Sequence, residues 1–208
     1  MSKPSPKEPQ SLEQSGPRVV IAEDEALIWM DLAEMLVDEG YQVIGQAGDG
    51  VRAIELAEQL RPDVVILDVK MPLLDGIAAA ERIAEERWAP VVILTAFSQR
   101  ELVERARDAG AMAYVVKPFT GSDLVPAIEM AMSRFAEIRA LESEVADLAD
   151  RLETRKRLDR AKGILQRDLG LSESEAFRWI QKTAMDLRLS MGQVAEGVVK
   201  HGPGVANG

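Results

Sequence analysis

The sequence predicts an α/β domain, a doubly wound five-stranded parallel sheet, followed by a helical connector and an all-α three-helix bundle. Three observations carry this prediction. Short apolar runs alternate with amphipathic segments up to about residue 118, a long segment then repeats apolar residues at helical spacing, and helix-capping patterns follow near the C-terminus. Because near-continuous Val and Ile runs suit strands buried on both faces, the alternation indicates a parallel sheet covered by helices.

Five strands are expected from apolar runs rich in Val and Ile. They are RVVIA (18–22), YQVIGQA (41–47), DVVIL (63–67), VVILT (91–95) and MAYVV (112–116). The segments between them carry apolar residues at helical spacing. Ile28, Leu32 and Leu36 form one such stripe, and Gly40 is expected to end that helix.

Composition excludes several classes of protein and site. The chain has no cysteine, so it cannot form a disulfide, a thiol nucleophile or a thiolate metal site. Its single histidine, His201, leaves little room for a zinc site or for histidine catalysis. Any bound metal is therefore expected to be a hard ion that prefers oxygen ligands.

The N-terminal residues 1–16 are rich in Pro, Ser, Lys and Glu and have no apolar centre that a secretion signal needs. We expect a disordered leader. No apolar run approaches the roughly 20 residues that cross a bilayer, so no membrane contact and a cytoplasmic location are expected.

Charge is distributed unevenly along the chain. Residues 1–150 hold 14 basic and 28 acidic residues, net −14, and residues 151–208 hold 11 and 7, net +4, which together give the overall −10. A basic C-terminal module on an acidic body is the interpretation, and its partner would be an anion.

A long amphipathic segment begins near Ser122 and continues past the α/β domain. Its apolar residues recur at alternating steps of three and four, the spacing of a coiled-coil seam, and the next position is Arg155. The seam consists of Ile138, Leu141, Val145, Leu148 and Leu152. Two interpretations stay open, a connector helix that packs on its own neighbouring domain and a coiled coil that makes a homodimer.

The C-terminal part is expected to form three short helices. Ser172 with Glu175, and Ser190 with Gln193, match the capping-box pattern of helix starts. The apolar stripes that would form the bundle core are Ala176, Ile180, Ala184 and Leu187 on one helix and Val194, Val198 and Val199 on the next.

Charged and polar residues follow the predicted strands. Ligands of open parallel sheets bind outside the carboxyl ends of the strands, so residues at those ends are expected to meet. These residues are Glu23, Asp24 and Glu25 after the first strand, Asp68 after the third, Thr95 at the end of the fourth and Lys117, followed by Pro118, after the fifth.

Clustered carboxylates either take up protons or bind a cation, and Mg²⁺ accepts a few carboxylates while keeping places for phosphate. Asp68 could then attack a phosphoryl donor, with Thr95 donating its hydroxyl to a phosphoryl oxygen and Lys117 balancing the charge. Taken singly, an Asp after a strand is often only a helix N-cap, and a Lys before Pro is often only solvated. Taken together, the strand ends fit one chemistry.

The motifs IAEDEALI, ILDVKMPLLDG, ILTAFS and AYVVKPF resemble, in order and spacing, the receiver domain of two-component response regulators over about residues 17–135. The resemblance implies a flavodoxin-like fold and Asp68 as the acceptor of a phosphoryl group from a sensor histidine kinase. It implies a Mg²⁺ site at Glu23, Asp24, Asp68 and the main-chain carbonyl of Lys70. Only intrinsic Mg²⁺-dependent phosphotransfer and autodephosphorylation are expected, with no enzymatic turnover.

The same resemblance implies that Thr95 and Lys117 contact the phosphoryl group and that Thr95 and Tyr114 form the switch. A cis peptide bond is expected before Pro118. One departure is Glu23, where many receivers carry Asp. Its side chain is expected to reach the metal differently or through water, which makes Asp24 the safer ligand.

The segment 151–167 carries seven basic and two acidic residues. It is either a solvated face or a surface for nucleic acid phosphates. A helix-turn-helix that reads DNA would need base-reading side chains on a later helix, and MGQVAEGVV has no Lys or Arg. RNA hairpins, which are recognised through backbone contacts and splayed loop bases, suit a compact basic bundle better.

RAKGILQ, SEAFRWIQKTAMD and QVAE resemble the ANTAR domain, an RNA-binding output of antitermination regulators, over roughly residues 145–200. The resemblance implies binding to stem-loops in nascent transcripts. The expected RNA-binding residues are Arg157, Arg160, Lys162 and Gly163. Ala176, Phe177, Ala184 and Met185 match the core of the family's bundle, and Trp179 either stacks on a base or packs in the core.

The expected domains are a receiver domain at 17–135, a connector at 136–154, an ANTAR domain at 155–200 and a flexible tail at 201–208. Other functions stay open. A regulator that binds DNA, or one that only contacts another protein, would keep the receiver and differ in its output. An aspartyl-phosphate hydrolase of the haloacid dehalogenase type would carry a second Asp two residues after the nucleophile, where this chain has Lys70.

Overall fold

A computed structural model describes residues 16–96 and 100–207, which include the predicted α/β domain, 17–135, except for residues 97–99. The end of the ILTAFS motif therefore lies outside the described residues. Residues 1–15 of the expected N-terminal leader, 1–16, lie outside the described residues. The described chain forms two compact units, one up to Ile138 and one from Arg139. Within the described ranges, no helix combines the length and the apolarity that crossing a membrane requires.

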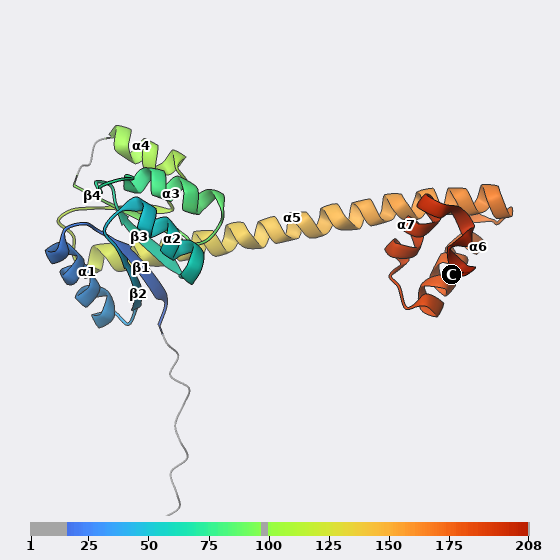
Figure 1. Ribbon diagram of the computed structural model, residues 1–208, viewed down its shortest axis with the longest axis horizontal. Helices are drawn as coiled ribbons and strands as arrows, with labels where there is room; N and C mark the ends of the chain where they lie inside the picture. Colours follow the sequence, from blue (N-terminus) through green and yellow to red (C-terminus); the bar gives the residue numbers. More distant parts are fainter. Residues whose placement is uncertain (1–15, 97–99, 208) are drawn as a thin grey trace, which may run out of the picture. The chain divides into compact units, whose positions relative to one another are not determined.

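The first unit is a five-stranded parallel sheet with the strand order β2-β1-β3-β4-β5 (Figure 1). Its strands are β1 (Arg18–Ala22), β2 (Gln42–Ala47), β3 (Val64–Asp68), β4 (Val91–Thr95) and β5 (Ala113–Val116). Each lies within one residue of its predicted bounds, and all neighbouring pairs are parallel. The predicted fold class is confirmed.

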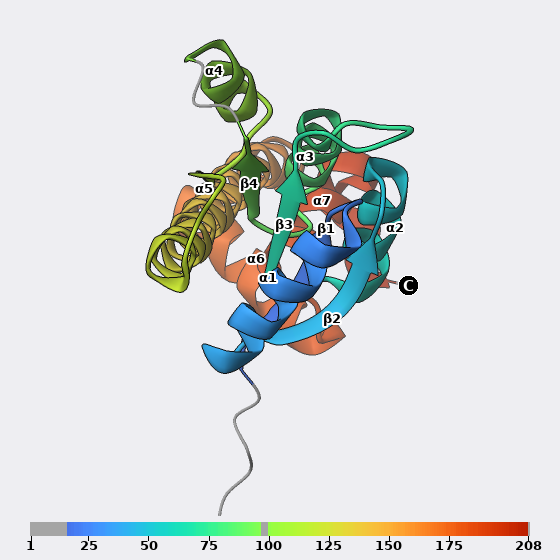
Figure 2. The same ribbon diagram turned by 90° about the vertical axis from the view of Figure 1, so that its left-hand side faces the viewer.

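Helices cover both faces of the sheet, as Figures 1 and 2 show. They are α1 (Ala26–Asp38), α2 (Gly50–Leu60), α3 (Gly76–Glu85), α4 (Arg100–Asp108) and the first part of α5 (Gly121–Leu169). Alternate residues of β1 enter two separate cores: Val20 packs with α2 and α3, and Ile21 packs with α1 and α5. This division explains why the strand reads as a continuous apolar run.

The ends of the helices follow the expected glycine positions. Gly40 and Gly110, which follow α1 and α4, both have positive φ angles, a conformation that glycine adopts without steric cost. At the start of α3, the Asp75 side chain accepts a hydrogen bond from the backbone of Ala78. The peptide bond between Lys117 and Pro118 is cis, as expected.

The second unit is a helical bundle formed by the end of α5, α6 (Glu173–Leu187) and α7 (Met191–His201), with a short 3-10 helix, η1 (Gly202–Asn207), within the expected tail. Both predicted capping boxes are present. The buried core consists of Ala161, Leu165, Ala176, Ile180, Ala184, Val194, Ala195 and Val198.

Two expectations about this unit are wrong. The first helix of the bundle is not a separate short helix, because α5 continues unbroken to Leu169 and the chain between Pro126 and that point contains no proline. Phe177 and Met185 are not core residues, since 44% and 74% of their surface is exposed. Each follows a buried alanine by one position, about 100° around the helix from the core stripe. Val199, which was also expected in the core, is 38% exposed and in the same way follows the buried Val198.

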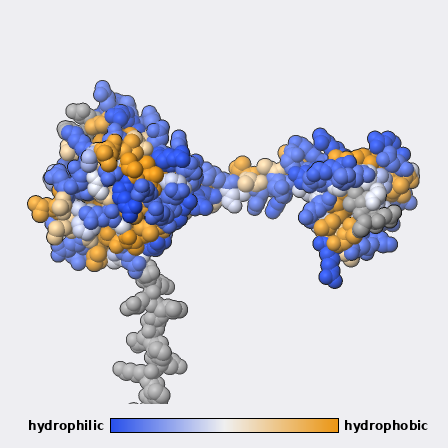
Figure 3. Space-filling model, viewed as in Figure 1, coloured by the Kyte–Doolittle hydropathy of each residue, from blue (hydrophilic) through white to orange (hydrophobic). Residues whose placement is uncertain are grey.

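The predicted seam of α5 is largely exposed. Leu141, Val145, Leu148 and Leu152 retain 54% to 66% of their surface, and hydrophobic surface is visible on this helix in Figure 3. Within the described part of the second unit, none of these four side chains belongs to the bundle core. The two interpretations of the seam, a connector that packs on its own neighbouring domain and a coiled coil that makes a homodimer, both stay open.

Candidate functional site

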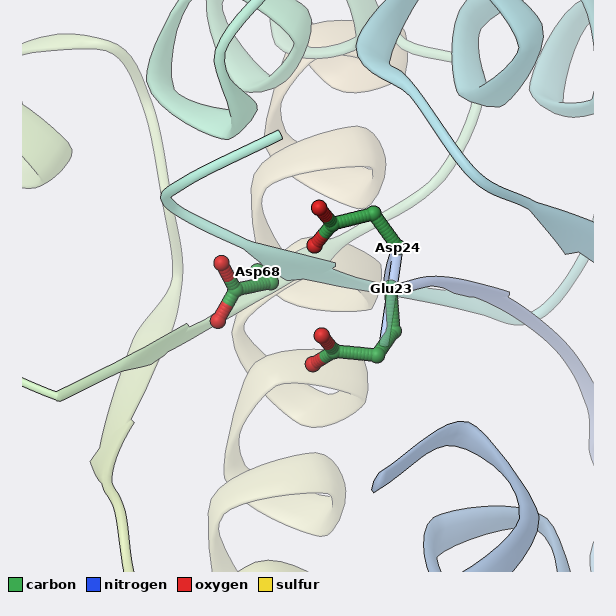
Figure 4. A group of neighbouring side chains, drawn as sticks. All are labelled: Glu23, Asp24 and Asp68. Carbon is green, nitrogen blue, oxygen red and sulfur yellow. The ribbon is translucent and has the colours of Figure 1, made fainter. Parts of the chain in front are cut away.

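Three carboxylates meet at the carboxyl ends of β1 and β3. One oxygen atom from each of Glu23, Asp24 and Asp68 lies within 4.8 Å of the others, and in Figure 4 the Glu23 and Asp24 side chains extend toward the side on which Asp68 lies. Glu23 and Asp68 are buried, whereas Asp24 is exposed. The predicted convergence of the first and third strand ends is therefore present in the structure.

Lys117 joins two of these carboxylates. Its Nζ lies 2.6 Å from Oε2 of Glu23 and 2.5 Å from Oδ1 of Asp68. The loop after β5 is held in place because the Lys117 backbone N–H donates to the Thr95 carbonyl at 2.8 Å. The ends of β1, β3, β4 and β5 thus contribute to one site.

Backbone groups orient the two buried carboxylates. The Lys70 N–H donates to Oδ2 of Asp68 at 2.6 Å, and the Glu25 N–H donates to Oε1 of Glu23 at 3.2 Å. The Glu23 N–H donates to the Ala47 carbonyl at 3.0 Å, which ties the end of β1 to β2. One carboxylate oxygen of Asp68 therefore contacts the Lys117 ammonium, and the other accepts a hydrogen bond from the Lys70 amide.

Burial and charge act against each other at this site. Burial raises the pKa of Glu23 above its usual value, although the hydrogen bond from Lys117 lowers it. Burial alone would lower the pKa of Lys117, but hydrogen bonds with Asp68 and Glu23 hold that pKa above its usual value. Lys117 is consequently a cation at neutral pH.

Ionised, the three carboxylates and the ammonium sum to −2. Their donors are all oxygens, at spacings that one small divalent ion can bridge. An open hollow of about 630 Å³ adjoins this cluster and is lined by residues that include Asp24, Lys70 and Pro72. The donor set, charge and access fit Mg²⁺ with room for a phosphoryl group.

The two predicted switch residues lie on neighbouring strands. Thr95 is buried at the end of β4, and Tyr114 of β5 is about half exposed and is paired in register with Ile93. Tyr114 lines a separate hollow of about 330 Å³ with residues of α4 and α5, among them Val103 and Met130. Sequence reasoning did not identify either hollow, because hollows depend on how helices pack.

The structure does not bring the four predicted RNA-binding residues onto one surface. At about 100° per residue, Arg157 and Arg160 lie on one side of α5, and Lys162 lies roughly opposite Arg160. Arg157 pairs with Glu196 of α7 at 3.9 Å. Gly163 and Arg160 are exposed, and within the described part of the chain Arg160 makes no ion pair or hydrogen bond.

Lys162 is held by two acidic residues of its own unit. Its Nζ lies 2.9 Å from Asp159 and 2.8 Å from Glu173, and hydrogen bonds with Glu173 and Asp159 raise its pKa. Trp179 is partly buried against the bundle core, which favours packing over base stacking for this residue. The exposed aromatic side chain of α6 is instead Phe177.

Comparison with protein-family models places two domains on the chain. Residues 19–129 match the response regulator receiver domain, and residues 146–199 match the ANTAR domain. The described boundary between the two compact units, after Ile138, lies between these matches.

Two curated relatives show how far the similarity extends. The transcriptional regulatory protein PdtaR of Mycobacterium tuberculosis is 67% identical over 183 residues, which cover 88% of this chain and 89% of the relative. The chemotaxis protein CheY of Thermotoga maritima is 37% identical over 114 residues, which cover 54% of this chain and 95% of CheY.

Solved structures resemble the first unit. The response regulator domain of Thermotoga maritima CheB has a TM-score of 0.53 and 28% identity and covers 57% of this chain and 97% of that chain. The receiver domain of a sensor histidine kinase from Pseudomonas aeruginosa PAO1, which has a magnesium ion coordinated in its active site cleft, has a TM-score of 0.52 and 29% identity. That match covers 57% of this chain and 98% of the other.

Proposed function

This chain belongs to the response regulators that join a receiver domain to an ANTAR domain, and we propose that phosphorylation of Asp68 by a sensor histidine kinase controls RNA binding by its C-terminal unit. The proposed phosphorylation of Asp68 rests on one observation: Lys117 bridges Asp68 and Glu23, and Asp24 lies beside them. A cytoplasmic location is part of the proposal.

In the proposed transfer, a carboxylate oxygen of Asp68 attacks the phosphorus of a phosphohistidine. The new O–P bond forms as the P–N bond breaks, and the electron pair leaves with the imidazole nitrogen, which takes a proton from water. Lys117 lies close enough to Asp68 to balance the charge of the incoming phosphoryl oxygens, and Thr95 would donate its hydroxyl to one of them.

The groups that would hold Mg²⁺ are Asp24, Asp68, the main-chain carbonyl of Lys70 and Glu23, the last directly or through water. When bound, the ion would neutralise negative charge on the phosphoryl group. Glu23 is already committed to Lys117 at 2.6 Å and its pKa is raised, which makes the exposed Asp24 the stronger candidate for a direct ligand.

The phosphoryl group would act on the rest of the protein through Thr95 and Tyr114. A repositioned Thr95 side chain would alter the packing beside Tyr114, on the adjacent strand, and so bias the surface formed by α4, β5 and α5. This change would favour the RNA-competent form of the C-terminal unit, and the exposed seam of α5 would then form a homodimer.

For the output, we propose binding to RNA stem-loops in nascent transcripts, which prevents terminator formation. The match of residues 146–199 to the ANTAR domain and the net charge of +4 over residues 151–208 support an RNA partner. Among charged residues, α7 offers only Glu196, Lys200 and its last residue, His201, which disfavours it as a DNA-reading helix.

The test compares the unchanged protein with Asp68→Asn and with Asp147→Asn, an exposed carboxylate on α5. Each is treated with a small phosphodonor and MgCl₂ and analysed by intact-mass spectrometry. We expect one phosphoryl group on the unchanged protein and on Asp147→Asn, and none on Asp68→Asn. Labelling that persists in Asp68→Asn would assign the acceptor to another residue.

RNA targets are then identified by crosslinking the phosphorylated protein to cellular RNA and sequencing what is attached. Stem-loops should be enriched with the unchanged protein relative to Asp68→Asn. The Arg160→Glu variant should bind recovered stem-loops more weakly and with a smaller dependence on salt concentration, because it loses one phosphate contact. Equal recovery with both proteins would contradict control by Asp68.

A further inference from the structure

The bundle exposes one aromatic ring beside a group of polar side chains. Phe177 follows Ala176, which is fully buried, and the ring is turned away from the core stripe with 44% of its surface exposed. It lines an open hollow of about 660 Å³. The other lining residues are Lys162, Ser172, Glu173, Ser174 and Arg178.

We propose that this hollow is the binding site for an unpaired base of the RNA, which stacks on the Phe177 ring while Arg178 contacts an adjoining phosphate. The inference rests on the proposed RNA-binding function and adds a position for one base. Neither the match to the ANTAR domain nor the basic composition of α5 assigns a role of this kind to Phe177.

The shape and chemistry of the lining favour a base over an apolar protein segment. Within the described residues, Phe177 is the sole apolar residue that lines the hollow, whereas a docking groove for a protein helix would present several. A base has a flat apolar face and polar edges, which match one ring surrounded by hydroxyl and charged groups. The hollow is also large enough for such a group.

The charges of the lining favour a polyanion. Lys162 is paired with both Glu173 and Asp159, so among the described residues of the lining Arg178 carries the charge that is not offset. In the described part of the chain, Arg178 is exposed and makes no ion pair or hydrogen bond, so its guanidinium is available to a phosphate. Glu173 is already paired with Lys162 at 2.8 Å, so its charge is partly offset.

Hydrogen bonds and an ion pair hold the other residues of the site together. The Ser172 backbone N–H and hydroxyl both donate to Glu175, at 2.8 and 2.6 Å, and this capping box fixes the start of α6. Lys162 connects α5 to the same helix end through Glu173. A ring held on a fixed helix loses little freedom when a base stacks on it, which favours binding.

The experiment measures binding of the full-length protein to a synthetic pool of RNA hairpins with randomised loops, by fluorescence anisotropy at several salt concentrations. Stacking on an aromatic ring contributes about 1–3 kcal/mol, which corresponds to a loss of roughly 5-fold to 150-fold. Phe177→Leu, which keeps an apolar side chain, should therefore weaken binding by about that factor at every salt concentration. Phe177→Trp should bind within about threefold of the unchanged protein.

Two further variants separate stacking from charge and from general surface effects. Arg178→Gln should weaken binding. It should also reduce the slope of log affinity against log salt concentration by about the amount that one phosphate contact contributes. Met185→Ala removes an equally apolar and more exposed side chain from the same helix and should bind like the unchanged protein. Thermal unfolding followed by circular dichroism checks that each variant is folded.

Binding of Phe177→Leu within twofold of the unchanged protein would overturn the base site and leave the proposed RNA binding standing. A loss with Phe177→Leu that is matched by Phe177→Trp and Met185→Ala would also overturn it, because no specific stack would then exist. If the unchanged protein binds no member of the hairpin pool and no RNA recovered by crosslinking, the proposed function fails and the base site fails with it.

Discussion

The Lys117 ammonium lies 2.6 Å from the Glu23 carboxylate, although 94 positions separate the two residues in the chain. Glu23 directly follows β1 and Lys117 directly follows β5, and β3 and β4 lie between these two strands in the order β2-β1-β3-β4-β5. Asp68 of β3 lies between them and shares the same ammonium. One cation therefore offsets two buried carboxylates, and a third remains beside them.

Replacing Lys117 with Met should strengthen Mg²⁺ binding. The change removes the positive charge that bridges Glu23 and Asp68 and leaves three carboxylates, so the site becomes more negative by one unit. Allowing for solvent screening, we expect affinity for Mg²⁺ to rise on the order of tenfold. Isothermal titration calorimetry with MgCl₂ measures this affinity.

Asp24→Asn is the matched control for this measurement, because it removes one negative charge from the same cluster and should weaken Mg²⁺ binding. Despite its tighter metal binding, Lys117→Met should accept phosphoryl groups more slowly, since no ammonium balances the incoming charge. Equal Mg²⁺ affinity in Lys117→Met and the unchanged protein would show that the ammonium and the ion do not share these carboxylates.

Gly76→Ala should damage both the fold and the phosphorylation site. A Cβ at Gly76 would lie 1.9 Å from the Asp68 carbonyl oxygen, which is backbone and cannot turn aside. The end of β3 must therefore shift, and we expect the free energy of unfolding to fall by about 3 kcal/mol. Urea denaturation measures the loss, and intact-mass analysis after phosphodonor treatment should show reduced labelling of Asp68.

Gly48→Ala is the control, because a Cβ there meets no atom within 4 Å and its φ angle is not positive. Its effect on unfolding should stay within about 0.5 kcal/mol. If Gly76→Ala were as stable as Gly48→Ala, the close approach of α3 to the end of β3 would be absent in solution.

The strand ends could be predicted from the sequence because four of the five apolar runs stop abruptly at a charged or hydroxyl residue. Asp68, Thr95 and Lys117 were placed at one edge by the topology of parallel sheets alone. The sequence could not show that Lys117 pairs with Glu23 and Asp68, since that choice depends on side-chain packing. It also could not locate the hollows, which form between separate helices.

The C-terminal unit was less predictable. Matching residues to a family pattern assigned Phe177 and Met185 to the core, and the structure exposes both. Helical geometry could have corrected this, because each lies one position after a core alanine. The continuous α5 was missed because basic residues around Arg155 were interpreted as the end of the seam, although charge does not end a helix.

The two capping boxes of the bundle should respond differently to acid. Hydrogen bonds from the Ser172 side chain and backbone lower the pKa of Glu175 below its usual value, whereas Gln193 in the second box does not titrate. A lowered folded-state pKa stabilises the protein above the unfolded pKa, near 4.5, and that contribution disappears as the pH falls through the lower folded value.

Accordingly, Ser172→Ala and Ser190→Ala should each lower the free energy of unfolding by about 1 kcal/mol at pH 7, the usual contribution of a helix N-cap. Below pH 4.5 the cost of Ser172→Ala should shrink, while that of Ser190→Ala stays constant. Thermal unfolding followed by Trp179 fluorescence, with Trp29 and Trp88 replaced by Phe, measures the bundle alone. If the destabilisation caused by Ser190→Ala shrank below pH 4.5 as much as that caused by Ser172→Ala, the role of Glu175 would be contradicted.

The exposed seam of α5 should pair two copies in the antiparallel direction. With Ile138 at heptad position a, residues at g and e flank the seam. A parallel dimer in register would place Glu137 against the Glu142 of its partner and Arg151 against Lys156, both like charges. An antiparallel dimer centred between Val145 and Leu148 would instead place Glu144 against Arg151 twice.

Because the chain has no cysteine, single-cysteine variants report this orientation without background. In the antiparallel arrangement Leu141 faces Leu152 of the second copy, so a mixture of Leu141→Cys and Leu152→Cys should oxidise to heterodimers after phosphorylation. Neither variant alone should crosslink, since identical positions would then lie about 16 Å apart along the helix. Efficient crosslinking of Leu152→Cys with itself would indicate the parallel dimer, and would mean that apolar packing along the seam outweighs repulsion between its flanking charges.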